Sequence, residues 1–188
     1  VDVCLFSTKY RKGDIYSPKS TWVHFTFNIW YAFLNSPVIL LGAIKNIDLV
    51  IHAIRFGGMV DLVFALYYYR IMKRQGVSQI HCHFGDHKLF IAHYCKRLLD
   101  MPLSVTIHSH ELHVNPNKKL FIESLKYCDK VFAISQLAVD MLVERYQVDE
   151  KKVILNRLFL DLDIWSAEKP LRVLTVGRFE PQKGFNYL

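Results

Sequence analysis

The sequence predicts an α/β fold in which helices flank a parallel sheet, and two observations support this. From Val77 onward, apolar runs of strand length alternate with segments of helical periodicity. Strands separated by helices at this spacing form a parallel sheet with the helices packed on it. The composition, 52% hydrophobic and 22% charged, is that of a folded globular chain and excludes a disordered one.

The individual elements follow from the same patterns. A helix is predicted over residues 59–74, where it ends in a basic turn before Gly76. After it, strands are predicted at residues 79–84, 103–107, 130–134, 152–155 and 172–176. The helices between them are predicted at residues 86–99, 118–127 and 137–146.

Residues 20–44 form a separate apolar and aromatic segment without Asp, Glu, Lys or Arg. A membrane-spanning helix needs about 20 continuous apolar residues, but His24, Asn28 and the Asn35-Ser36-Pro37 break divide this segment. The favoured interpretation is that this segment forms helices that face the core. The second is an amphipathic surface that rests on anionic lipid, because basic residues flank the segment at Lys9, Arg11, Lys12, Lys19 and Lys45. A true membrane span is the least favoured of the three.

Charge and cysteine content bear on partners and location. The net charge is +7, and residues 1–100 carry 12 Lys and Arg against 6 Asp and Glu. The four cysteines are scattered without a C-x-x-C pair, as expected for buried free thiols in a reducing compartment. We therefore expect a cytoplasmic protein, with a peripheral site on the inner face of the plasma membrane as an option. No nucleic-acid partner is expected.

Polar residues follow four successive predicted strands, at the edge of a parallel sheet where ligands gather. Asp86 is interpreted as a helix N-cap, with Gly85 leaving room for substrate. His108 ends the next strand, and Glu111 either orients it or caps the following segment. The third and fourth strands are followed by Ser135, which could start a helix at residue 136, and by Asn156.

A zinc-dependent hydrolase is the main alternative. Seven of the nine histidines lie between residues 81 and 113, and H-C-H-F-G-D-H resembles the H-x-H-x-D-H signature of the metallo-beta-lactamase family. The segment of this chain is one residue longer than the signature, because the additional Gly85 shifts the turn before the Asp-His pair. His81 alone is expected to be a buried strand histidine, and His93 and His113 are expected on a helix face or loop surface.

Five motifs in order resemble those of glycosyltransferase family 4. They are I-H-C-H-F-G at 80–85, P-L-S-V-T-I-H-S-H-E at 102–111, C-D-K-V-F-A-I-S at 128–135, K-V-I-L-N at 152–156 and V-G-R-F-E-P-Q-K-G at 176–184. The resemblance implies the GT-B architecture of two facing Rossmann-like domains, with the acceptor held by the first and the nucleotide sugar by the second. Residues 1–160 would form the first domain, incomplete at its start. Residues 161–170 would be the linker, and 171–188 the first strand and loop of a truncated donor domain.

The resemblance also implies an activity. The protein would transfer a sugar, with retention, from a nucleotide-sugar donor to a glycan or lipid-linked acceptor in cell-envelope polysaccharide or glycolipid synthesis. It would need no metal ion or other cofactor, and the fragment alone would be inactive. A noncatalytic Rossmann-like binding module, interacting through the aromatic N-terminal half, is the remaining alternative.

Residue roles follow from the same resemblance. His108, in T-x-H, would be catalytic and lie beside the transferring sugar. Arg178 and Lys183 would hold the diphosphate, where a guanidinium and an ammonium stabilise the charge that grows on the leaving oxygen. Gly177 and Gly184 would let the backbone approach the phosphates. The substrate-binding residues would be Gly85, Asp86, Glu111, Ser135 and Asn156.

Overall fold

The computed structural model describes residues 3–7 and 23–157. The chain divides into two units, Val1–Arg157 and Leu158–Leu188, and every described residue lies in the first. The predicted linker at 161–170 and the start of the donor domain at 171–188 lie outside the described residues. The same holds for Gly177, Arg178, Lys183 and Gly184.

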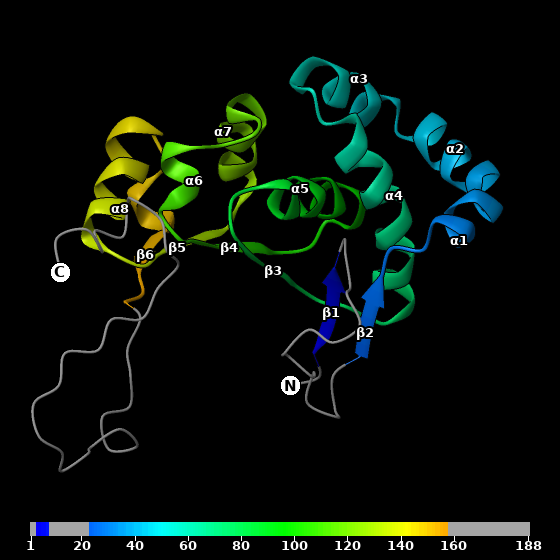
Figure 1. The fold of residues 1–188 in the computed structure, drawn as a ribbon, viewed down its shortest axis with the longest axis horizontal. Helices are drawn as coiled ribbons and strands as arrows, with labels where there is room; N and C mark the ends of the chain where they lie inside the picture. Colours follow the sequence, from blue (N-terminus) through cyan, green and yellow to red (C-terminus); the bar gives the residue numbers. More distant parts are fainter. Residues whose placement is uncertain (1–2, 8–22, 158–188) are drawn as a thin grey trace, which may run out of the picture. The chain divides into compact units, whose positions relative to one another are not determined.

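A four-stranded sheet forms the second half of the first unit, and all its strands are parallel (Figure 1). In order across the sheet, the strands are β3 (Ile80–His83), β4 (Leu103–Ile107), β5 (Lys130–Ala133) and β6 (Val153–Leu155). Four of the predicted strands are thus confirmed, each with ends that differ from the prediction by at most one residue. The sheet confirms the predicted Rossmann-like α/β class.

Helices connect these strands and cover one face of the sheet (Figure 1). They are α5 (His87–Leu99), α6 (His110–His113), α7 (Lys118–Tyr127) and α8 (Gln136–Asp140). The helix predicted at 137–146 is divided, because α8 passes into a π-helical turn at Met141–Arg145. A short 3₁₀ turn at Glu150–Lys152 precedes β6. In β3, Ile80 and Cys82 face the helices and are buried, whereas His81 and His83 lie on the opposite face and are exposed.

The N-terminal half contains a second, two-stranded parallel sheet and four helices. The strands are β1 (Cys4–Ser7) and β2 (Val23–Thr26). The helices are α1 (Ile29–Leu34), α2 (Ser36–Lys45), α3 (Ile47–Phe56) and α4 (Met59–Arg74). The helical interpretation of residues 20–44 is therefore wrong at its start, where β2 pairs with β1. Pro37 lies in the first turn of α2, where its missing N–H removes no helical hydrogen bond.

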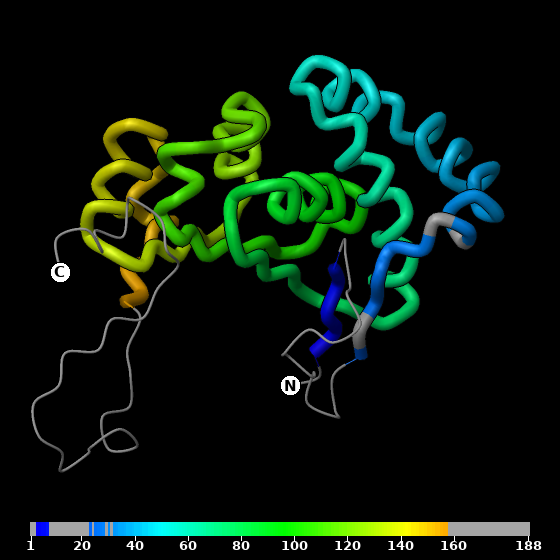
Figure 2. Tube along the Cα trace, in the orientation of Figure 1, coloured from blue at the N-terminus to red at the C-terminus, as the bar shows by residue number. Residues whose placement is uncertain are grey.

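Helix α4 joins the two halves, and its predicted bounds are confirmed (Figure 2). The Tyr68 hydroxyl donates a hydrogen bond to the Ser7 carbonyl oxygen at 2.8 Å, and Phe27 packs on Phe64 and Tyr67. On its other side α4 packs against α5. A cavity of about 550 Å³ lies between β1 and β3, with Met72 among its lining residues.

The core-facing interpretation of the apolar N-terminal segment is wrong for most of the large side chains that the structure describes there. On α1, Trp30, Phe33 and Leu34 are 71–77% exposed, and on α2 Leu40, Leu41 and Ile44 are 50–62% exposed. Among the described residues, no single helix is long and apolar enough to cross a membrane. Helices α2 and α3 reach the required length and composition only together, and they are bent by 91°.

Three of the four cysteines, Cys82, Cys95 and Cys128, are buried, and Cys4 is half-buried. All four are free thiols, as predicted. Burial raises the pKa of Cys95 to about 12, so this thiol stays protonated and unreactive at neutral pH.

Candidate functional site

The carboxyl ends of the strands bring the predicted polar residues to one edge of the sheet. The parallel hydrogen bonds continue past the strands, from Phe84 N to Thr106 O at 2.9 Å and from Asn156 N to Ala133 O at 2.8 Å. The loops after β3 and β4 are therefore neighbours, as are those after β5 and β6. This is the arrangement predicted from the alternating pattern.

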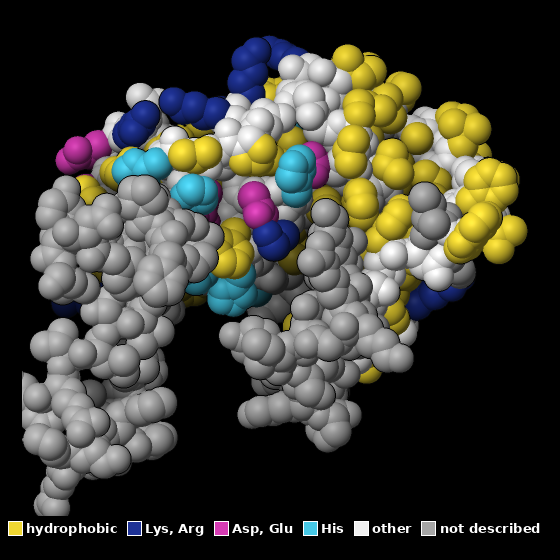
Figure 3. All heavy atoms as spheres, viewed as in Figure 1, with side chains coloured by type: hydrophobic (Ala, Val, Ile, Leu, Met, Phe, Trp, Pro, Cys, Tyr) yellow, Lys and Arg dark blue, Asp and Glu magenta, His cyan; other side chains and the backbone are white. Residues whose placement is uncertain are grey.

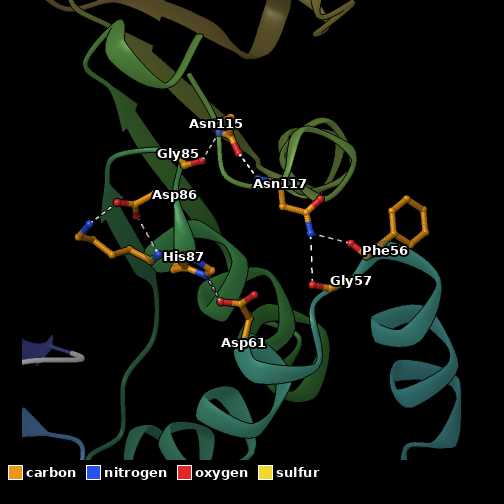
Figure 4. Close-up of polar contacts among 9 residues, drawn as sticks. Phe56, Gly57, Asp61, Gly85, Asp86, His87, Asn115 and Asn117 are labelled. Carbon is orange, nitrogen blue, oxygen red and sulfur yellow. Dashed lines mark hydrogen bonds and ion pairs between the residues drawn. The ribbon is translucent and has the colours of Figure 1, made fainter. Parts of the chain in front are cut away.

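Glu111 ties the first two loops together. Its Oε1 accepts hydrogen bonds from the main-chain N–H of Gly85 at 3.0 Å and of His108 at 3.1 Å, and its side chain is buried. Asn115 donates from Nδ2 to the Gly85 carbonyl oxygen at 2.9 Å (Figure 4). The sequence left two roles open for Glu111, and the structure shows it holding the main chain of His108.

Two residues in these loops adopt left-handed backbone conformations that are uncommon outside glycine. Phe84 has φ 76° and Ser109 has φ 77°. Such conformations cost about 1–3 kcal/mol, and they persist where surrounding contacts hold them. Here the bonds to Glu111 provide these contacts, so the two loops are held in a fixed shape on either side of His108.

His108 lies between an aromatic ring and a second histidine. Its ring stacks on Phe84 with 4.5 Å between centroids, and its Nε2 is 3.3 Å from His83 Nδ1. Desolvation by neighbouring atoms, followed by repulsion from His108, lowers the pKa of His83. His83 is therefore neutral near pH 7, and one ring donates its N–H to the other. The sequence reasoning included His83 only in the zinc alternative, where H-x-H on a strand puts His81 and His83 on one face.

The structure gives Gly85 a packing role. A Cβ at this position would lie 2.3 Å from Cε2 of Phe121 and 3.1 Å from Cδ1 of Ile107. The space beside Gly85 is thus filled by the core, and the expectation that it leaves room for substrate is not met on that side. The prediction for Asp86 is confirmed, because its carboxylate caps α5 by accepting from Lys88 N at 3.0 Å (Figure 4).

A carboxylate–imidazole pair borders the same loop, and the sequence reasoning missed it. His87, in the first turn of α5, contacts Asp61 of α4 with 2.8 Å between Nδ1 and Oδ1 (Figure 4). Burial raises the pKa of Asp61, although the hydrogen bond with His87 opposes this effect. The contact leaves the other ring nitrogen of His87 for solvent or a ligand. No local pattern identifies the pair, since its members lie 26 residues apart.

The other two strand ends differ from each other. The Ser135 hydroxyl caps α8 by accepting from Ala138 N at 3.2 Å, so the predicted helix start at residue 136 is confirmed. Asn156 is exposed, and it lines an open cavity of about 510 Å³ with Thr106 and Phe132. His81 lies there too, bonded to Ser104 Oγ at 2.8 Å and Thr106 Oγ1 at 3.1 Å. The expectation of a buried His81 is therefore wrong.

Most histidines of the zinc alternative lie apart from one another, although His81, His83 and His108 are neighbours. His93 is fully buried in α5, contrary to the prediction of a surface position, whereas His110 and His113 are exposed on α6. His87 is engaged by Asp61, as described above. Within residues 3–7 and 23–157, no three His, Cys, Asp or Glu side chains are arranged to hold a metal ion.

Comparisons with known proteins agree with this geometry. The family model for Glycosyltransferase Family 4 matches residues 3–163, which is most of the chain. No curated protein gives a significant match. The matched region contains both sheets and the strand-end loops with His108 and Glu111. The chain belongs to glycosyltransferase family 4 and carries a glycosyltransferase domain of Rossmann-like α/β fold.

Proposed function

We propose that this domain is the acceptor-side half of a retaining GT-B glycosyltransferase. The enzyme moves a hexosyl group from a nucleotide-sugar donor to a glycan or lipid-linked acceptor in cell-envelope polysaccharide or glycolipid synthesis. It works in the cytoplasm, on the inner face of the plasma membrane, and needs no metal ion. The observation that carries the proposal is the position of His108 at the end of β4, held by Glu111 and flanked by His83 and Phe84.

The chemistry at this edge suits a sugar substrate. An imidazole side chain can form hydrogen bonds with a hydroxyl group, and Phe84, which stacks on His108, keeps part of its ring exposed for contact with a pyranose. The loops on both sides are fixed, which lowers the cost of ordering them when substrate binds. His108 thus acts by hydrogen bonding to the transferring sugar or to the reacting groups beside it.

The donor diphosphate would be bound by residues beyond the described part of the chain. Arg178 and Lys183 supply the positive charge that stabilises the leaving diphosphate, and Gly177 and Gly184 give access to main-chain N–H groups. On the acceptor side, Asn156 and the free nitrogen of His87 are among the exposed polar groups at the same edge.

Product stereochemistry tests the proposal. An enzyme that contains this chain and a complete donor domain is incubated with a panel of nucleotide sugars and a lipid extract, after exhaustive treatment with a chelator. Proton NMR of the new glycosidic bond should show the same anomeric configuration as the donor. An inverted product would contradict the retaining mechanism, and activity that returns only with added metal would contradict the metal-free one.

A further inference from the structure

The first three helices expose a large apolar surface. We define the α1–α3 apolar face by nine side chains that are each 50–77% exposed: Trp30, Phe33, Leu34, Leu40, Leu41, Ile44, Ile47, Ile51 and Ile54. Hydrophobic side chains gather over these helices in Figure 3. Scattered exposed apolar residues are normal on protein surfaces, but a contiguous set of this kind marks an interaction site.

Helices α1 and α2 consist mainly of apolar residues, and all three helices turn apolar side chains outward. Along α3, Ile47, Ile51 and Ile54 recur at a spacing of four and three residues and form one stripe. Leu49 and Ala53 lie on the opposite side of α3 and are buried in the core. Helix α3 therefore has two apolar sides, and only the inner one is used within the described structure.

Hydrogen bonds and an ion pair attach α3 to the rest of the domain. Asn117 donates from Nδ2 to the carbonyl oxygens of Phe56 at 2.7 Å and Gly57 at 3.3 Å (Figure 4). Asp48 forms an ion pair with Arg97 of α5 at 3.4 Å. These contacts hold α3 in place, so exposure of its outer stripe is a property of the folded domain.

The charges beside this face indicate what covers it. Lys45 and Arg55 are exposed at the ends of α2 and α3, and Arg70 and Arg74 of α4 line a groove with Ile39 of α2. The single acidic residue among residues 29–56 is Asp48, which is paired with Arg97. An apolar face bordered by basic residues complements a bilayer with anionic headgroups, where each Lys or Arg contributes about 1 kcal/mol.

We propose that the α1–α3 apolar face is a membrane-docking surface that lies in the headgroup and upper acyl region of an anionic bilayer. Each of α2 and α3 has 10 residues and is about 15 Å long, half of the hydrocarbon thickness. Their bend of 91° and the fastening of α3 keep them from forming one straight span. The helices therefore lie on the membrane with their outer side chains inserted. This proposal rests on the proposed function, because a domain docked on the bilayer can reach a lipid-linked acceptor in the same membrane.

Vesicle flotation with the 188-residue chain tests this surface. The wild type should float with vesicles of phosphatidylcholine and phosphatidylglycerol at low salt, and less with phosphatidylcholine alone or in 1 M salt. The double variant Ile44→Glu/Ile51→Glu should lose binding by on the order of tenfold or more, since two inserted side chains become charged. The matched control Val114→Glu/Leu137→Glu changes two residues that are each 64% exposed and lie outside the face, and it should bind like the wild type.

Three results would overturn the proposal. The first is a wild type that does not bind anionic vesicles, and the second is a control variant that loses as much binding as the test variant. The third is a dimer, detected by light scattering, that only the Ile44→Glu/Ile51→Glu variant dissociates. In that case a second copy of the chain would cover the α1–α3 apolar face. Sugar transfer to an acceptor dispersed in detergent, measured with the complete enzyme, separates these results from failure of the glycosyltransferase assignment.

Depth of insertion distinguishes a docked helix from a re-entrant one. In the Trp22→Phe/Trp165→Phe variant, Trp30 is the sole remaining tryptophan of three. Brominated lipids should quench its fluorescence more strongly when the bromines are shallow on the acyl chain, at about 5–10 Å insertion. Stronger quenching by deep bromines would overturn the surface-lying arrangement.

Discussion

At the scale of single residues, Gly85 is the position where the strand-end loop depends most on packing. Its backbone needs no left-handed conformation, so the cost of a side chain here is steric. Gly85→Ala should lower the free energy of unfolding by about 1–3 kcal/mol, because the new methyl group overlaps Phe121. Phe121→Leu in the same chain should recover part of that loss, and urea denaturation measures both.

Gly76→Ala is the matched control for Gly85→Ala. Gly76 has φ +65° but has open space around its Cβ position, so its substitution reports backbone strain without overlap. Its cost should be about 1 kcal/mol and should not change with Phe121→Leu. Equal rescue of both glycine variants by Phe121→Leu would contradict the steric explanation for Gly85.

His93 makes stability depend on pH. Burial, then repulsion from His52 and Arg97, lowers the pKa of His93 to about 3, and neither ring nitrogen has a partner among the described residues. In the unfolded chain this histidine takes up a proton near pH 6.5, whereas in the folded domain it stays neutral until about pH 3. The free energy of unfolding is therefore highest above pH 6.5 and falls as the pH drops toward 3. This one residue should cost about 2 kcal/mol between pH 7 and pH 5.

Replacing the ring tests this dependence. His93→Met should raise the melting temperature at pH 5 relative to the wild type and flatten its change with pH, because the variant has no buried imidazole to protonate. His113→Met, at an exposed position on α6, should leave the pH dependence unchanged. If His93→Met shows the slope of the wild type between pH 7 and pH 5, another group causes the acid loss.

At the scale of elements, Asn117 performs two tasks at once. Its Oδ1 caps α7 by accepting from Leu120 N at 3.1 Å, while its Nδ2 holds the end of α3. Asn117→Ala removes both contacts and should cost about 2 kcal/mol in urea denaturation. Asn117→Ser can keep the cap but cannot reach the carbonyl oxygens of Phe56 and Gly57, so it should cost less. Equal losses in the two variants would show that the cap contributes little.

Element positions were predictable where a pattern was long or bounded by clear signals. Helices α4 and α7 and strand β4 have the predicted ends, because their periodicity runs over whole elements and Gly76 or a strand follows. Strand β2 was missed, since four residues of an apolar run look the same in a strand and in a helix. The π-helical turn after α8 carries no local signal either.

The candidate site was predictable in part for a related reason. The edge of the sheet follows from the alternation of strands and helices, so the neighbourhood of His108 could be predicted. The bonds from Glu111 to Gly85 and from Asp61 to His87 each join residues 26 positions apart, and only the folded chain brings them together. Likewise, the exposure of the α1–α3 apolar face depends on which side of each helix the core uses. Composition alone does not specify this.

At the scale of the whole molecule, the domain carries two separate surfaces, one for sugar transfer and one for membrane docking. The strand ends of β3–β6 carry the site around His108, and the α1–α3 apolar face lies on the N-terminal helices that α4 connects to α5. Membership of glycosyltransferase family 4 assigns the activity, and the proposed docking surface would bring that activity to lipid-linked acceptors. Each surface can be altered without the other, because they share no side chain.

The most direct test of the central claim is the transfer rate of His108→Ala in the enzyme with its complete donor domain. If His108 lies beside the transferring sugar, turnover should fall by about a hundredfold or more while the melting temperature stays close to that of the wild type. His113→Ala, which removes an exposed histidine of α6, should transfer sugar at the wild-type rate. A folded His108→Ala enzyme that also keeps the wild-type rate would contradict the assignment of this sheet edge as the site of transfer.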